Sequence, residues 1–276
     1  MADKSNLAKR IKFYEKQSRT DLHPNLPYVA RLDGMKFSKW TKCLEKPFDN
    51  RFTDIMRETT KYLVEQCNGE AVIGYTQSDE ITLVFREGAF GNMWWGGRVD
   101  KITSYLVGLA GYYFNKNHNI DEKIDKMALF DCRIFQVPNR KEAVNSVIWR
   151  EQDAVKNSIS MLAQSQFSHN TLHGLNGSQM QEKLMVEKGI NWNNLPTKQK
   201  RGTYVQKNVI GRTFTSEEID QLPLKHEARL NPNLTYQRTD YKFVDMPIIT
   251  KVTNRVEVFF ENALPETQKQ LINQLS

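Results

Sequence analysis

Two short acidic motifs in the chain contain the residue types needed for metal-assisted phosphoryl chemistry. Asp33 ends an apolar, alternating stretch and is followed at once by Gly34. Asp79 and Glu80 lie in the segment TQSDE, between the apolar stretches AVIGY and ITLVF. Each motif alone is typical of a solvated turn. If both turns meet at one end of a sheet, Asp33 and Asp79 could hold Mg²⁺, which binds few carboxylates together with water and phosphate oxygens.

The glycine after Asp33 extends this hypothesis from a metal to a nucleotide. Gly34 would let the backbone approach a ligand closely, and the amides of the turn that follows could cradle phosphates. Two ions about 4 Å apart would clamp an in-line phosphoryl transfer, which indicates nucleotidyl transfer. The chain has no Walker A motif, so a P-loop does not hold the nucleotide.

The elements that must position these motifs can be read from hydrophobic periodicity and caps. Asp49 is a candidate N-cap, and the TQSDE segment joins two strands as a hairpin. The order is β-α-β-β-α-β, which predicts an α+β, ferredoxin-like fold. The predicted elements are a strand at 28–33, a helix from Asp49 to about 67, strands at 71–75 and 81–85, a helix at 99–113 and a strand at 132–137.

The pattern changes after residue 140. A long helix is expected at about 145–168 and a shorter one at 178–187, followed by a basic loop at 188–216. The tail contains the strand-like segment VEVFF and a last short helix. We therefore expect a palm-like catalytic domain at 1–140, and a helical and basic RNA-binding region with a C-terminal α+β extension at 141–276.

Composition excludes several classes of protein. Of the 276 residues, 39% are hydrophobic and 11% aromatic, which excludes wholesale disorder. No apolar run approaches the ~18 residues of a membrane helix, and the charged N-terminus is unlike a secretory signal. Cys43, Cys67 and Cys132 have no CxxC spacing. This odd, scattered set predicts reduced thiols and a cytoplasmic protein that does not contact membranes.

The net charge is concentrated in one segment. Residues 188–216 contain six basic residues and no acid, and so carry most of the formal charge of +7. Trp192 and Tyr204 are interleaved with these charges, which favours a contact with an RNA phosphate backbone; the alternative is a solvated loop. The candidate RNA-binding residues here are Lys198, Lys200 and Arg201.

Several motifs together resemble one known family. RLDGMKF, KPFD and YTQSDEITLVF are similar to the catalytic core of the tRNA-histidine guanylyltransferase superfamily. The segments WREQDAVKNSISMLAQ, HGLNGSQMQEKL and INWNNLPTKQKRGT resemble its guanylyltransferase-like branch of 3′–5′ RNA polymerases. The resemblance covers residues 28–205. It implies a polymerase palm that extends tRNA or tRNA-like RNA at the 5′ end, with two Mg²⁺ ions and with ATP, GTP or other NTPs as substrates.

The resemblance also assigns residues. It implies that Asp33, the Gly34 carbonyl and Asp79 bind the metal ions, and that Glu80 is a further catalytic acid. The positions that it implies for nucleotide binding are Asp33, Gly34, Met35, Lys36, Phe37, Ser38, Lys46, Asp49, Ser78 and Asp79. Lys46 could instead be a surface charge, and Asp49 could be only a helix cap. On the long helix, Arg150, Asp153 and Asn157 share one face, which is either an RNA-binding or a solvated face.

The implied reaction has two stages. ATP activates a 5′-monophosphate RNA end as a 5′-adenylyl group, and the 3′-hydroxyl of an incoming NTP then displaces AMP; a 5′-triphosphate end could react directly. The histidine-specific enzymes carry a histidine where this chain has Val155. This departure favours template-directed 5′-end repair.

Three alternatives remain open beside repair. The chain could be an enzyme that adds a single guanosine to histidine tRNA, a non-catalytic RNA-binding module, or a nucleotide cyclase. The resemblance also implies a homotetramer.

Overall fold

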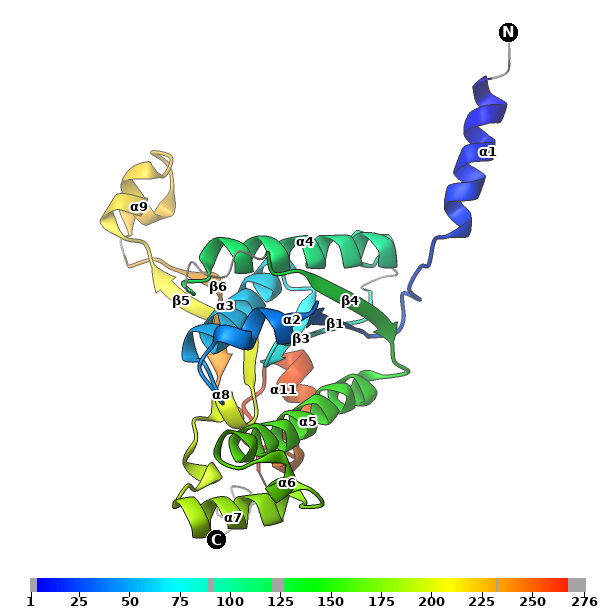
Figure 1. Ribbon diagram of the computed structural model, residues 1–276. Coiled ribbons are helices and arrows are strands. Elements are labelled where there is room, and N and C mark those ends of the chain that lie inside the picture. Colours follow the sequence, from blue (N-terminus) through cyan, green and yellow to red (C-terminus); the bar gives the residue numbers. More distant parts are fainter. Residues whose placement is uncertain (1–3, 89–91, 121–126, 232, 268–276) are drawn as a thin grey trace.

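The computed structural model describes residues 4–88, 92–120, 127–231 and 233–267. Within them, an antiparallel sheet has the strand order β4-β1-β3-β2-β5-β6 (Figure 1). The strands are β1 (Tyr28–Gly34), β2 (Ala71–Gln77), β3 (Glu80–Phe85), β4 (Phe130–Gln136), β5 (Thr203–Thr213) and β6 (Thr235–Val244). The first four strands in this order form the ferredoxin-like sheet, so the predicted α+β fold class is confirmed.

Helices cover both faces of the sheet. The helices α3 (Asn50–Gln66) and α4 (Val99–Asn117) pack on one face, and α5 (Arg140–Gln166) and α11 (Arg255–Glu261) pack on the other (Figure 1). Alternate residues of β1 point to opposite layers, because side chains along a strand alternate between its faces. Leu32 lies in the core under α3 and α4, whereas Val29 lies in the core under α5.

The remaining helices are mostly short. The α-helices are α1 (Lys4–Gln17), α2 (Phe37–Trp40), α6 (His169–Leu172), α7 (Gly177–Lys188), α8 (Thr197–Lys200), α9 (Ser216–Gln221) and α10 (Glu227–Leu230). The 3₁₀ helices are η1 (Thr41–Cys43), η2 (Trp94–Gly97), η3 (Trp192–Asn194) and η4 (Ile249–Lys251). Helix α1 extends away from the body of the molecule (Figure 1). No helix in the described residues is both long enough and apolar enough to span a membrane.

Two predictions about the second half of the chain are wrong. The expected basic loop at 188–216 contains strand β5, which pairs with β2 and extends the sheet. The strand-like VEVFF forms helix α11, whose Val258, Phe259 and Phe260 are buried against the sheet. The segment forms a helix despite its β-propensity, because strand preference depends strongly on the neighbours that are available for packing. The last short helix falls largely on 268–276, outside the described residues.

The division of the chain at residue 140 stays a prediction. Strands β5 and β6 come from the second part and continue the sheet of the first through the β2–β5 pairing. The C-terminal half of α5 packs with α6 and α7 around a smaller core that contains Leu162, Leu172 and Leu184. The sheet edge and this helical region together frame the candidate site.

Candidate active site

Strand register brings the two acidic motifs together. Asp33 on β1 lies opposite Glu80 on β3, and the N–H of Gly34 donates to the carbonyl of Asp79 at 3.1 Å. Ser78 and Asp79 form the tight turn between β2 and β3, and Ser78 has a left-handed φ of 53°. The hairpin tip is therefore held against the end of β1, and Asp33 and Asp79 line one cavity.

Without a cation, the charged forms of the Asp33 and Asp79 carboxylates are both unfavourable. Burial raises the pKa of Asp79, and the negative charge of Asp33 raises it further. Burial also raises the pKa of Asp33, with a contribution from Asp131, which lies opposite it on β4. In the described residues no set of three or more His, Cys, Asp or Glu side chains could hold a metal. The two carboxylates that line the cavity are the donor type that Mg²⁺ prefers, and Mg²⁺ takes few carboxylates together with phosphate oxygens and water.

The turn after Gly34 is shaped by close packing. A Cβ on Gly34 would lie 2.4 Å from the ring of Phe37, so only glycine fits. Lys36 has a left-handed φ of 60° and precedes α2. The side chain of Phe37 is buried in the core, so Phe37 could contact a nucleotide only through its backbone. Met35, Lys36 and Ser38 are exposed, and the first N–H groups of α2 have no helical acceptor.

Glu80 is held by helix α5. Arg150 Nε donates to Glu80 Oε1 at 2.6 Å, and Arg150 Nη2 donates to Asp153 at 2.9 Å. Asn157 Nδ2 donates to the same carboxylate of Asp153 at 3.2 Å. The face of α5 that is predicted to bind RNA therefore forms a row of hydrogen-bonded polar side chains, which ends at Glu80 of the hairpin. The row lies beside the carboxylate pair, and Asn157 and Arg150 line the same cavity as Asp33 and Asp79.

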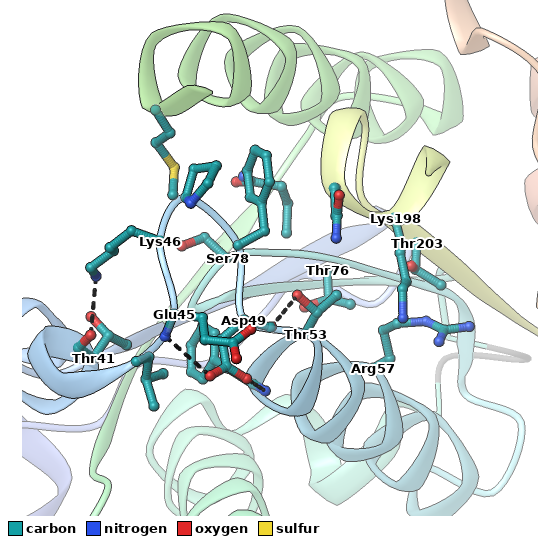
Figure 2. A pocket seen from close by; sticks show the side chains of 17 residues that line it. Thr41, Glu45, Lys46, Asp49, Thr53, Arg57, Thr76, Ser78, Lys198 and Thr203 are labelled. Carbon is teal, nitrogen blue, oxygen red and sulfur yellow. Dashed lines mark hydrogen bonds between the residues drawn. The ribbon is translucent and has the colours of Figure 1, made fainter. Parts of the chain in front are cut away.

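A second cavity also adjoins the hairpin tip (Figure 2). Its lining combines apolar side chains, such as Leu44 and Phe52, with polar ones, such as Lys46 and Thr53. Gln77, Ser78 and Met161 line both this cavity and the one that contains Asp33 and Asp79. Ser78 therefore marks the point where two binding spaces meet next to the carboxylates.

Besides Ser78, two predicted nucleotide-binding residues lie in the wall of this second cavity. Lys46 lines it, and its Nζ donates to the carbonyl of Thr41 at 3.1 Å (Figure 2). Asp49 also lines it but is buried, and it caps α3 by accepting from the N–H groups of Arg51 and Phe52. It accepts as well from the N–H of Glu45 and from the Arg51 guanidinium. The role of each as a nucleotide contact stays a prediction.

The cap predicts an acid-dependent stability. Hydrogen bonds from Arg51 hold the pKa of Asp49 at about 2, below its ordinary value of 3.8. A lowered folded-state pKa stabilises the fold above about pH 4, and the contribution is lost as the pH falls toward 2. We expect Asp49→Asn, which still caps a helix but loses the charge, to lower the unfolding free energy at pH 7 by about 2 kcal/mol. Chemical denaturation at pH 7 and pH 2.5 measures this difference. An equal loss at both pH values would contradict the account.

The three basic residues predicted to bind RNA all have partners inside the molecule. Lys198 lines the second cavity and pairs with Asp54 at 2.8 Å. Lys200 Nζ donates to the carbonyl of Asn193. Arg201 lies 3.9 Å from the buried carboxylate of Glu151 and is largely buried. Their role toward RNA stays a prediction.

Sequence reasoning missed several residues of the second cavity. Arg57 and Thr203 line it, but they come from the middle of α3 and the start of β5. Thr203 falls in the segment expected to be a loop, so no sequence signal places it beside β2. A helical-wheel argument could have found Arg57, since it lies one turn after Thr53, which also lines the cavity.

A ferredoxin-like sheet with a carboxylate pair and a glycine turn at one strand end, flanked by two cavities, defines a palm-type nucleotidyltransferase. The sequence profile of the tRNAHis guanylyltransferase family matches residues 8–138. A bacterial tRNA(His) guanylyltransferase-like protein in complex with ATP superposes with a TM-score of 0.74 and 35% identity, over 92% of this chain and 98% of that one. The chain therefore belongs to the tRNA(His) guanylyltransferase family and is a nucleotidyltransferase.

Other relatives agree with this assignment. The tRNA(His) guanylyltransferase of Candida glabrata is 29% identical over 78% of this chain and 98% of its own length. An uncharacterised mimivirus protein is 30% identical over 73% of this chain and 77% of its own. A bacterial guanylyltransferase-like protein in complex with GTP has a TM-score of 0.67 and 31% identity, over 89% of this chain and 94% of that one. The predicted superfamily is thus confirmed, and a non-catalytic module and a nucleotide cyclase lose support.

Proposed function

We propose that this enzyme adds nucleotides to the 5′ end of tRNA or tRNA-like RNA, in a metal-dependent and template-directed 3′–5′ reaction that repairs 5′ ends. The observation that carries the proposal is that Asp33 and Asp79 line a cavity that shares three of its lining residues with the second cavity. A nucleotidyl transfer needs two substrates to meet at one phosphate, and the shared wall at Gln77, Ser78 and Met161 provides such a meeting point.

The metal site would consist of Asp33, Asp79 and the carbonyl of Gly34. Bound Mg²⁺ lowers the pKa of an attacking hydroxyl and stabilises the charge on the leaving oxygen. The chain's own residues do the rest. The turn after Gly34 would meet the phosphates through its backbone N–H groups, because the side chain of Phe37 packs into the core. Arg150 holds Glu80 beside the carboxylate pair.

The two cavities suggest separate places for the substrates. The cavity beside α3 would hold a nucleoside triphosphate, with Lys46 near its phosphates. Two solved relatives are described as complexes with ATP and with GTP, which supports nucleotide binding by this chain. The other cavity, lined by Arg150, Asn157 and Ser160, would receive the RNA 5′ end. Activation of the 5′ end by ATP before addition, which the family resemblance implies, is part of the same proposal.

The second candidate function is the addition of a single guanosine to histidine tRNA. The names of the curated relatives favour it. Val155, at the position where the histidine-specific branch has a histidine, favours repair. The cytoplasmic location, expected from the scattered cysteines, and the homotetramer, expected from the family, stay predictions.

The direction of synthesis tests the proposal. A tRNA that lacks its first nucleotide, carrying a 5′-monophosphate, is incubated with the protein, ATP, each NTP and Mg²⁺, and its two ends are mapped separately. We expect extension at the 5′ end alone, and none when a chelator replaces the metal. Extension only at the 3′ end, or full activity in the chelator, would contradict the proposal.

A further inference from the structure

The roof of the cavity beside α3 comes from a distant part of the chain. Helix α8 places Lys198 and Gln199 in the cavity lining, opposite Asp49 and Thr53 of the α3 region. In Figure 2, Lys198 reaches down from α8 toward Thr203 and Arg57. Lys198 and Asp54 are 144 residues apart in sequence. The cavity therefore has walls from two segments that are distant in sequence.

Two side-chain contacts join α8 to α3, and Ser158 of α5 also donates to the carbonyl of Lys200 at the end of α8. Lys198 Nζ donates to Asp54 Oδ1 at 2.8 Å, and Gln199 Nε2 donates to Asn50 Oδ1 at 3.2 Å. Asn50 and Asp54 are four residues apart and so lie on one face of α3. Neighbouring residues of α8 thus bridge to successive turns of one helix face. We call these four residues the α8 clasp.

The clasp also leaves positive charge at the cavity wall. Arg57 Nη1 donates to Asp54 Oδ1 at 2.8 Å, so two cations share one carboxylate. Partial burial alone would raise the pKa of Asp54, but the hydrogen bonds from Lys198 and Arg57 lower it. The buried Nε of Arg57 has no hydrogen-bond partner among the described residues. The wall beside the clasp therefore favours a ligand that is anionic and rich in acceptors, as a nucleotide is.

We propose that the α8 clasp closes the cavity over the bound nucleoside triphosphate, so that Lys198 serves nucleotide binding and not contact with the RNA backbone. The proposal rests on the proposed function only in taking the ligand to be a nucleotide. The two lysines of α8 then have different roles, because Lys200 donates to the carbonyl of Asn193 and does not line the cavity. Lys198 is thus a positioning residue that holds the roof of the nucleotide site.

Calorimetric titration of ATP and of GTP, each with Mg²⁺, into the full-length protein tests the clasp. We expect Lys198→Ala to raise the Kd about five-fold, because it removes the partly exposed ion pair between α8 and α3 and one of the positive charges at the cavity wall. Lys198→Arg should stay near the wild-type Kd, since it keeps the bridge. Lys200→Ala is the matched control and should leave the Kd unchanged. The shift in Tm on adding NTP should shrink only in Lys198→Ala.

RNA binding gives the second readout. The salt dependence of binding to a 5′-truncated tRNA should be the same for Lys198→Ala and wild type. A slope reduced by about 0.7 to 0.9 would show a lost phosphate contact and would overturn the proposal. Equal NTP affinity of wild type and Lys198→Ala, or an equal loss in Lys200→Ala, would overturn the clasp alone. Absence of NTP binding by the wild-type protein would overturn the proposed function itself.

Discussion

Replacing Asp79 with asparagine should reduce nucleotide addition by about 1,000-fold or more while the fold is kept. The substitution removes one of two carboxylates from the proposed metal site, and loss of one preorganised electrostatic group at a reacting centre costs about 10²- to 10³-fold even without a metal. Asp79 lies in a tight turn and not in the core. Because burial and the charge of Asp33 both disfavour its carboxylate, the neutral amide should not lower Tm in the absence of metal.

Rates of 5′ addition and thermal melting should be measured on the same preparations. Asp33→Asn should behave like Asp79→Asn, since both side chains line one cavity. Asp100→Asn is the matched control. Asp100 pairs with Arg98 at the exposed start of α4, outside both cavities. Near-normal addition by Asp79→Asn would contradict the proposed metal site. A fall in Tm would mean that the loss of activity has a structural cause.

The catalytic half of the fold could be predicted because its signals are local. Asp49 shows as an N-cap in sequence and is one in the structure, with α3 starting at the next residue. The hairpin around Ser78 and Asp79 follows from two apolar stretches separated by polar residues. Once β1 and β3 pair, their register places Asp33 opposite Glu80. The convergence of the two motifs could therefore be predicted from the sequence pattern.

The second half resisted prediction because its structure depends on contacts distant in sequence. Strand β5 forms where β2 offers an open edge, and the charges of Lys207 and Arg212 conceal its alternation. The segment VEVFF has strong strand preference but is buried as a helix. The partners of Lys198 and Arg201 are Asp54 and Glu151, and nothing in the sequence pairs them. The charge of the segment indicates an exposed basic surface, whereas in the structure both side chains form ion pairs with acidic residues of the same chain.

The template base is the strongest discriminator between repair and single-guanosine addition. A repair polymerase can leave base selection to pairing with the opposite strand, whereas a guanosine-adding enzyme must select its base by protein contacts. Val155, in place of the histidine of the specific branch, favours the repair function. We expect the added nucleotide to change from G to A, C or U as the opposing base changes, with each correct nucleotide favoured at least about 10-fold, the preference that 1.4 kcal/mol of pairing energy would give.

The most direct measurement of this claim uses four tRNAs that lack their first nucleotide and differ only in the base opposite the gap. Each is incubated with wild-type protein, ATP, Mg²⁺ and all four NTPs, and the added 5′ nucleotide is identified by sequencing. We expect the added nucleotide to be the Watson–Crick complement of the opposing base in all four tRNAs. Guanosine added whatever base lies opposite, and only to histidine tRNA, would contradict the claim.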